Sequence, residues 1–92
     1  MLEANQVQEK LPYDVEILAI DRHNLALDIT RTFADIRLNI LSLNTLVEGE
    51  NAKIDIVMET RKPEKLDKLK EELYKIEGIT KVSLEKKKDK TN

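Results

Sequence analysis

Cysteine and tryptophan are absent from this chain of 92 residues, and histidine occurs only once, as His23. A chain without cysteine forms no disulfide, no thiolate zinc site and no cysteine nucleophile. One histidine cannot build a histidine metal cluster, and Ser42 and Ser83 have no second histidine to activate them. We therefore expect no catalytic residue, no metal site and no cofactor in this chain.

Neither sign of charge dominates, because 16 lysines and arginines face 18 acidic residues and give a net charge of -2. A general nucleic-acid binder usually has a basic excess, so DNA is not an expected partner. No apolar run is long enough to span a membrane, and no signal-peptide pattern opens the chain. These features predict a soluble, cytoplasmic protein without a membrane partner.

The hydrophobic share of 40% is enough for one modest core. Residues 1–12 have no periodicity and are predicted to be a linker or disordered arm. Residues 86–92 are predicted to be a charged tail. The domain is accordingly placed at residues 13–85.

Apolar periodicity alternates between the spacing of strands and that of helices. Strands are predicted at residues 13–21, 38–47, 52–60 and 79–85. The first strand is apolar on both faces toward its end, which favours a central position in a sheet. Two helices are predicted from apolar stripes, one of Leu25, Ile29, Phe33 and Ile36 and one of Leu66, Leu69, Leu73 and Ile76.

The ends of the helices carry recognisable signals. Asp21 or Asn24 is positioned to cap the first helix, and Pro63 is expected to be the first residue of the second. Gly78 is expected to stop the second helix in a left-handed conformation. The pairs Glu64 with Lys68 and Glu71 with Lys75 have the spacing of ion pairs on its exposed face.

Residues 48–51 are predicted to form a hairpin turn between the second and third strands. The register then pairs Val47 with Ala52 and places one apolar pair after another on the same side of the sheet. The remaining predicted pairs are Thr45 with Ile54, Leu43 with Ile56 and Leu41 with Met58.

The order strand, helix, strand, strand, helix, strand predicts an α+β ferredoxin-like sandwich. Two right-handed crossovers place both helices on one face of a four-stranded antiparallel sheet. The other face has no helix to cover it, and apolar residues on it indicate a partner or a second copy. The register assigns Leu18, Ile20, Ile40, Leu46 and Val57 to this open face, as a candidate oligomer interface.

Several proteins that use this fold are excluded by residues that they need. The metal-carrying version needs a pair of cysteines, and the RNA-recognition version needs aromatic residues on its middle strands. An acylphosphatase needs glycines in a phosphate-binding loop after the first strand. The two glycines here, Gly49 and Gly78, are elsewhere.

Residues 15–45, which read VEILAIDRHNLALDITRTFADIRLNILSLNT, resemble the opening of an ACT domain. The family pattern is Asp-Arg-Pro-Gly-Leu before the first helix and Gly-Ile-Asn-Ile into the second strand. Residues 21–25 and 37–40 stand in these places. Within the family, the chain is similar to the C-terminal ACT domain of RelA/SpoT-type (p)ppGpp synthetase/hydrolases, partly through residues 78–82.

The resemblance implies a non-catalytic, allosteric regulatory domain of a GTP pyrophosphokinase in the stringent response. It also implies a homodimer that binds a small amino acid between subunits, and a parent protein that contacts the ribosome. The candidate ligand-binding residues are Asp21, Arg22, His23, Asn24, Leu25 and Asn39.

This sequence departs from the family pattern where His23 replaces proline, and where Asn24 and Arg37 replace glycines. The side chain of Asn24 is expected to narrow or close the ligand pocket. His23 is also explained as a solvated loop residue, Asp21 as a helix cap, and Asn39 as a partner of backbone groups. Two other functions remain open, namely a structural domain that binds protein or ribosomal RNA, and the ACT domain of an amino-acid biosynthetic enzyme or stand-alone regulator.

Overall fold

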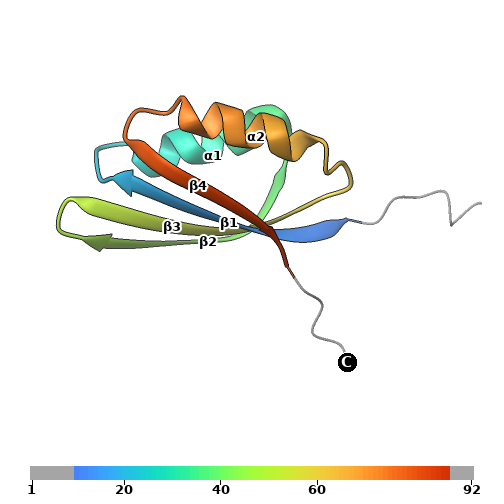
Figure 1. The fold of residues 1–92 in the computed structure, drawn as a ribbon, viewed down its shortest axis with the longest axis horizontal. Coiled ribbons are helices and arrows are strands. Elements are labelled where there is room, and N and C mark those ends of the chain that lie inside the picture. The colour runs from blue at the N-terminus through green and yellow to red at the C-terminus, as the bar shows by residue number, and fades with distance from the viewer. Residues whose placement is uncertain (1–9, 88–92) are drawn as a thin grey trace, which may run out of the picture.

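The computed structural model describes residues 10–87, which form one sheet covered on one face by two helices (Figure 1). The four strands are all antiparallel and lie in the order β2-β3-β1-β4. This is the predicted ferredoxin-like sandwich, and β1 is central as predicted. The elements are β1 (Leu11–Ile20), α1 (Leu25–Ile36), β2 (Asn39–Glu48), β3 (Asn51–Thr60), α2 (Lys65–Tyr74) and β4 (Ile79–Lys86).

β1 begins two residues before its predicted start. Leu11 lies opposite Thr60 of β3, and the carbonyl of Pro12 accepts a hydrogen bond from the N–H of Lys87 at 3.0 Å. Leu11 and Pro12 therefore belong to the sheet rather than to the predicted arm. Residues 1–9 of that arm and residues 88–92 of the predicted tail lie outside the described residues.

The core lies between the sheet and the two helices, which form separate layers in Figure 1. One face of β1 supplies Val15, Ile17 and Ala19, which are buried, because successive side chains of a strand point to opposite faces. The helices contribute the predicted apolar stripes except for Ile76, which packs against the core from beyond the end of α2. Their fully buried members are Ile29, Phe33, Leu69 and Leu73.

The predicted hairpin is confirmed between β2 and β3. Glu48 and Asn51 close it as a pair, and Gly49 has a φ of +61°. A positive φ at the first of two central residues is typical of the type II′ turn, which matches the twist of the strands. The predicted pairs of Val47 with Ala52, Thr45 with Ile54 and Leu43 with Ile56 are all present.

The predicted register is wrong at the start of β2. Met58 lies opposite Ile40 rather than Leu41, because the ladder shifts between Ile40 and Ser42. This β-bulge adds one residue to β2, and one extra residue reverses the face to which the preceding side chain points. Ile40 consequently packs against the core on the helix side and does not lie on the open face.

The ends of the helices differ from the predictions. Asn24 precedes α1 in a left-handed conformation with a φ of 65°, and no side chain caps the helix, so neither Asp21 nor Asn24 does so. α2 begins at Lys65, two residues after Pro63, because the carbonyls of residues 62 and 63 accept the first turn's hydrogen bonds. Gly78 has a φ of +100° but lies four residues beyond the helix, where the chain turns into β4.

The ion pairs on the exposed face of α2 are also different from those predicted. Glu72 binds both Lys68, at 3.2 Å, and Lys75, at 3.0 Å. The predicted pairs of Glu64 with Lys68 and Glu71 with Lys75 do not form among residues 10–87. Both lysines approach Glu72 instead, because it lies four residues from one and three from the other.

Candidate ligand-binding site

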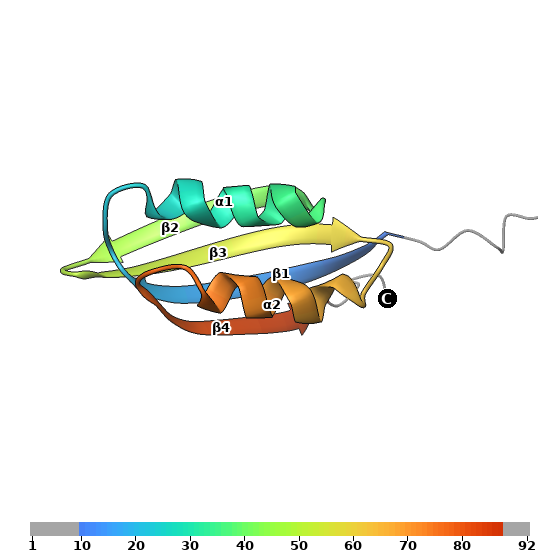
Figure 2. The same cartoon turned by 90° about the horizontal axis from the view of Figure 1, so that it is seen from above.

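Three loops meet at one end of the sheet, where β1 ends (Figure 2). They are residues 21–24 before α1, the β2–β3 hairpin, and the turn between α2 and β4. The N–H of Ile20 donates to the carbonyl of Gly78, and the N–H of Asp21 donates to the carbonyl of Glu50, each at 2.8 Å. The loop of residues 21–24, called the β1–α1 loop, is thus fixed on both sides.

Gly78 is required for this close approach. A Cβ atom at Gly78 would lie 3.2 Å from the carbonyl oxygen of Ile20, and the φ of +100° is rarely adopted by other residues. The glycine therefore allows the α2–β4 turn to press against the end of β1.

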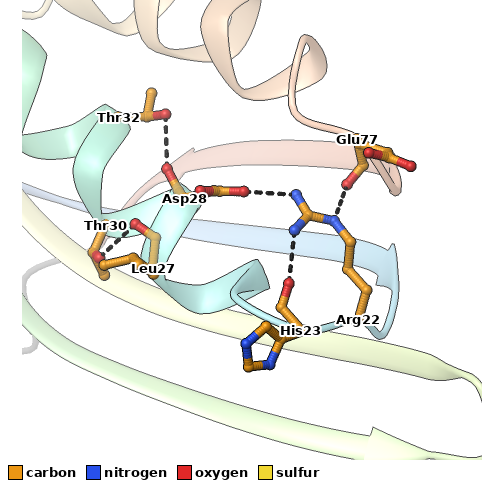
Figure 3. A network of polar contacts seen from close by, with 7 residues as sticks. All are labelled: Arg22, His23, Leu27, Asp28, Thr30, Thr32 and Glu77. Carbon is orange, nitrogen blue, oxygen red and sulfur yellow. Dashed lines mark hydrogen bonds and ion pairs between the residues drawn. The ribbon is translucent and has the colours of Figure 1, made fainter.

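Arg22 binds three parts of this end of the molecule (Figure 3). Its Nε donates to the carbonyl of Glu77, and its two terminal nitrogens donate to the carbonyl of His23 and to Oδ2 of Asp28, all at 2.8 Å. A guanidinium has its donors in a rigid fork, so one side chain can hold three acceptors in fixed directions. Arg22 therefore positions the β1–α1 loop, and its contact with a ligand stays a prediction.

The remaining predicted residues of the loop separate into exposed and buried ones. Asp21, His23 and Asn24 are exposed. Leu25 is only 4% exposed and its side chain belongs to the core, so a ligand contact at Leu25 stays a prediction. The side chain is buried because Leu25 begins the apolar stripe of α1, and that stripe faces the sheet.

Asn39 lies at the opposite end of the sheet from Asp21. Asn39 is opposite Glu59 of β3, whereas Ile20, next to Asp21, is opposite Asn51 at the start of β3. Eight residues of strand separate these two levels, which corresponds to about 26 Å. One chain therefore does not bring Asp21 and Asn39 together, and the two predicted ligand contacts are parts of different surfaces.

The chemistry available at the two ends is hydrogen bonding to a charged, polar molecule. Asp21 offers a carboxylate, and the first turn of α1 carries backbone N–H groups that have no partner within the helix. Nδ2 of Asn39 donates to Oε2 of Glu59 at 3.0 Å, and the amide oxygen is the acceptor that this side chain offers. Residues 10–87 contain no cluster of acidic residues and histidine that could hold a metal ion.

Sequence reasoning did not identify Asp28 and Glu77 as partners of Arg22. An acidic residue in the first turn of a helix is a weak signal, because it is also explained by the helix dipole. Glu77 contributes its backbone carbonyl, which no pattern of side chains can reveal.

The fold and the β1–α1 loop define the class of protein. A sequence profile of the ACT domain family matches residues 8–83, which is most of the chain. The chain therefore belongs to the ACT domain family, as its resemblance to that family indicated.

Within this family the chain is related to GTP pyrophosphokinases. It is 36% identical over 66 residues to a probable GTP pyrophosphokinase of Mycobacterium leprae, and 33% identical over 66 residues to the bifunctional (p)ppGpp synthase/hydrolase RelA of Mycobacterium tuberculosis. Each match covers 71% of this chain but only 8% and 9% of the respective relative. The chain thus spans less than a tenth of the length of these relatives.

A solved structure supports the fold. The crystal structure of the ACT domain from the GTP pyrophosphokinase of Chlorobium tepidum superposes with a TM-score of 0.73 at 17% identity. The match covers 83% of this chain and 99% of that one. Among residues 10–87, no helix is long and apolar enough to cross a membrane.

Proposed function

We propose that this chain is a non-catalytic regulatory module, the C-terminal ACT domain of a cytoplasmic (p)ppGpp synthetase/hydrolase. In this proposal it acts by dimerising and by binding a small amino acid between two copies. The kinship with GTP pyrophosphokinases supports the choice of parent. The observation that carries the mechanism is the separation of Asp21 and Asn39 by the length of the sheet, because only a second copy can complete the site.

The free edge of β2 is the proposed surface for dimerisation. Leu41 and Val47 on this strand are 52% and 49% exposed, and Leu27 on the neighbouring α1 is 48% exposed. An edge strand has unpaired backbone N–H and C=O groups along one side, and another strand can pair with them. Apolar side chains beside such an edge add a hydrophobic contribution to the pairing.

Antiparallel pairing of two β2 edges would complete the proposed site. In that arrangement the start of one β2 lies beside the hairpin end of the other. The β1–α1 loop lies at the hairpin end, so Asp21 of one copy comes near Asn39 of the second copy. A symmetric dimer would contain two such sites, since the interface is the same for both copies.

The proposed ligand is a small amino acid with a free ammonium and carboxylate. The ammonium needs oxygen acceptors, and Asp21 and the amide oxygen of Asn39 provide them. The carboxylate would accept hydrogen bonds from the N–H groups of Ala26 and Leu27 in the first turn of α1. The side chain of Asn24 occupies part of the loop where the family has glycine.

The first prediction concerns an amino-acid site shared between two copies of the chain. Binding is measured by calorimetric titration with branched-chain amino acids. We expect Asp21→Ala and Asn39→Ala each to abolish binding while the fold remains intact. Neither residue is buried, and Asp21 caps no helix. An equal mixture of the two variants should recover binding, because each mixed dimer regains one intact site. Asn24→Gly should strengthen binding or create it.

As a control, circular dichroism of every variant measures whether its fold is intact. Recovery in the mixture requires both a dimer and a shared site, so a mixture that stays inactive contradicts the shared site. No response of either the unmodified chain or Asn24→Gly at millimolar amino acid would favour the second candidate function. That candidate is a structural domain that binds protein or the ribosome, and the side chain of Asn24 in the loop favours it.

A further inference from the structure

The face of the sheet away from the helices is not covered by a helix and carries mostly negative charge. Its strands contribute six carboxylates but only two lysines, Lys53 and Lys81. Lys10 adds a charge just before β1, where it binds Glu59 of β3 at 3.5 Å. The six acidic residues are Asp14, Glu16, Glu48, Asp55, Glu59 and Glu85.

Acidic residues lie directly opposite one another on this face. Glu16 of β1 is paired with Asp55 of β3, and Asp14 of β1 is paired with Glu85 of β4. Like charges in directly opposed positions destabilise an antiparallel sheet. These two pairs place negative charges side by side, and a positively charged partner would reduce the repulsion within each pair.

Lys53 is surrounded by these carboxylates. It binds Oε2 of Glu16 at 3.0 Å. The hydrogen bond and charge of Glu16, with further contributions from Asp55 and Glu48, raise the pKa of Lys53. Lys53 is one positive charge beside three carboxylates, so the net charge of this part of the face is negative.

The hairpin end of the same face carries exposed apolar side chains beside Lys53 and Lys81. Leu18, Ile20 and Leu46 are 37%, 45% and 56% exposed. A hollow of about 280 Å³ lies over β3, between Leu18 of β1 and Leu46 of β2, and Glu48 and Lys53 also line it. From Leu18 to Asp14 is four residues along β1, or about 13 Å, so the hollow and the acidic residues lie within reach of one short helix.

The negative charge of the face favours some kinds of binding partner over others. A second copy in the same orientation would place acidic residues against acidic residues, and nucleic acid would bring phosphates to them. The acidic residues do not converge on a metal ion, since residues 10–87 contain no such group. Lysine or arginine beside leucine-like side chains complements both halves of the face.

We propose that the open sheet face binds a basic amphipathic helix of a protein partner. The apolar side chains of that helix occupy the hollow at Leu18 and Leu46, and its lysines or arginines face Asp14, Glu16 and Asp55. This interaction is independent of dimerisation at the β2 edge and of the amino-acid site, because it uses a different surface.

The second prediction is tested on the 92-residue chain with an amphipathic helical peptide made only of leucine and lysine. Its affinity is measured by calorimetry, and its position by amide chemical shifts. The double change Asp14→Asn with Asp55→Asn should weaken binding about fivefold, as expected for two surface charge contacts. The same double change should leave the unfolding temperature equal or higher, because it removes like-charge repulsion.

A matched double change serves as the control on the helix side. Glu64→Gln with Glu71→Gln removes the same number of charges from α2. It should not change the affinity, whereas Leu46→Gln should lower it.

Four results would overturn the proposal. They are equal binding of a peptide with glutamate in place of lysine, no binding of the lysine peptide at millimolar concentration, shifts confined to the helices, or an equal loss of affinity in the control variant. Binding of a polyuridine RNA to this face would identify a different class of partner and would also contradict the proposal.

Discussion

Asn24 and Arg37 are the two non-glycine residues with positive φ among residues 10–87, at 65° and 66°. Asparagine tolerates the left-handed region well, because its short polar side chain can bond locally. Arginine has no such advantage. Arg37 is held there by the end of α1, where its N–H donates to the carbonyl of Ala34 and the N–H of Leu38 donates to that of Phe33. Nζ of Lys65 also donates to the carbonyl of Ile36 at 3.0 Å.

The third prediction concerns the left-handed backbone conformation of Arg37. Arg37→Gly should raise the free energy of unfolding by about 1 kcal/mol, because glycine adopts the left-handed conformation without a Cβ clash. Urea denaturation measures the change. Arg31→Gly, at an exposed position inside α1, should have the opposite sign and a similar size. A loss of stability in Arg37→Gly would show that the arginine side chain contributes more than its backbone strain costs.

At the scale of elements, α2 is stabilised on its exposed face by a three-residue ion cluster. The hydrogen bonds from Lys75 and Lys68, together with their charges, lower the pKa of Glu72. A carboxyl whose pKa is lower in the folded state contributes stability above its unfolded-state pKa. That contribution is lost as the pH falls through the folded-state value.

The fourth prediction follows from this dependence of stability on pH. Glu72→Gln should be less stable than the unmodified chain near neutral pH, and the difference should vanish in acid below the folded-state pKa of Glu72. Urea denaturation of both chains across this pH range measures the difference. Glu71→Gln is the control, because Glu71 has no ion pair among residues 10–87 and should show a smaller dependence on pH. A difference that stays constant with pH would contradict the role of Glu72.

At the scale of the whole molecule, the two edges of the sheet have different character. β2 is ten residues long and exposes Leu41 and Val47, whereas β4 has eight residues and ends in charged ones. Short strands and charged side chains protect an edge from pairing, and β2 lacks that protection along most of its length. The molecule therefore has one edge suited to association.

The fifth prediction is that Val47→Lys weakens the dimer at least about tenfold, because it places a charge in a desolvated contact. Sedimentation equilibrium at micromolar concentration measures the dissociation constant. Thr80→Lys on β4 is the control and should not change it. A monomeric unmodified chain, or an equal effect of both variants, would contradict dimerisation through β2.

Side-chain periodicity was enough to predict the order of the elements, the central place of β1, the core stripes of both helices and most of the hairpin register. These features are local, because a spacing of two or 3.6 residues directly determines which side chains share a face. The resemblance of residues 15–45 to the ACT family was likewise readable from the residues alone.

Other features depend on contacts between segments that are distant in the chain. The bulge that turns Ile40 toward the core arises from the pairing of β2 with β3, and no local pattern indicates one extra residue. Arg22 is occupied by the carbonyl of Glu77, which is 55 residues away and carries no side-chain signal. The separation of Asp21 from Asn39 follows from the length and direction of α1 and the strands. Asp21 and Asn39, which both belong to the family pattern, therefore do not lie close together within one chain.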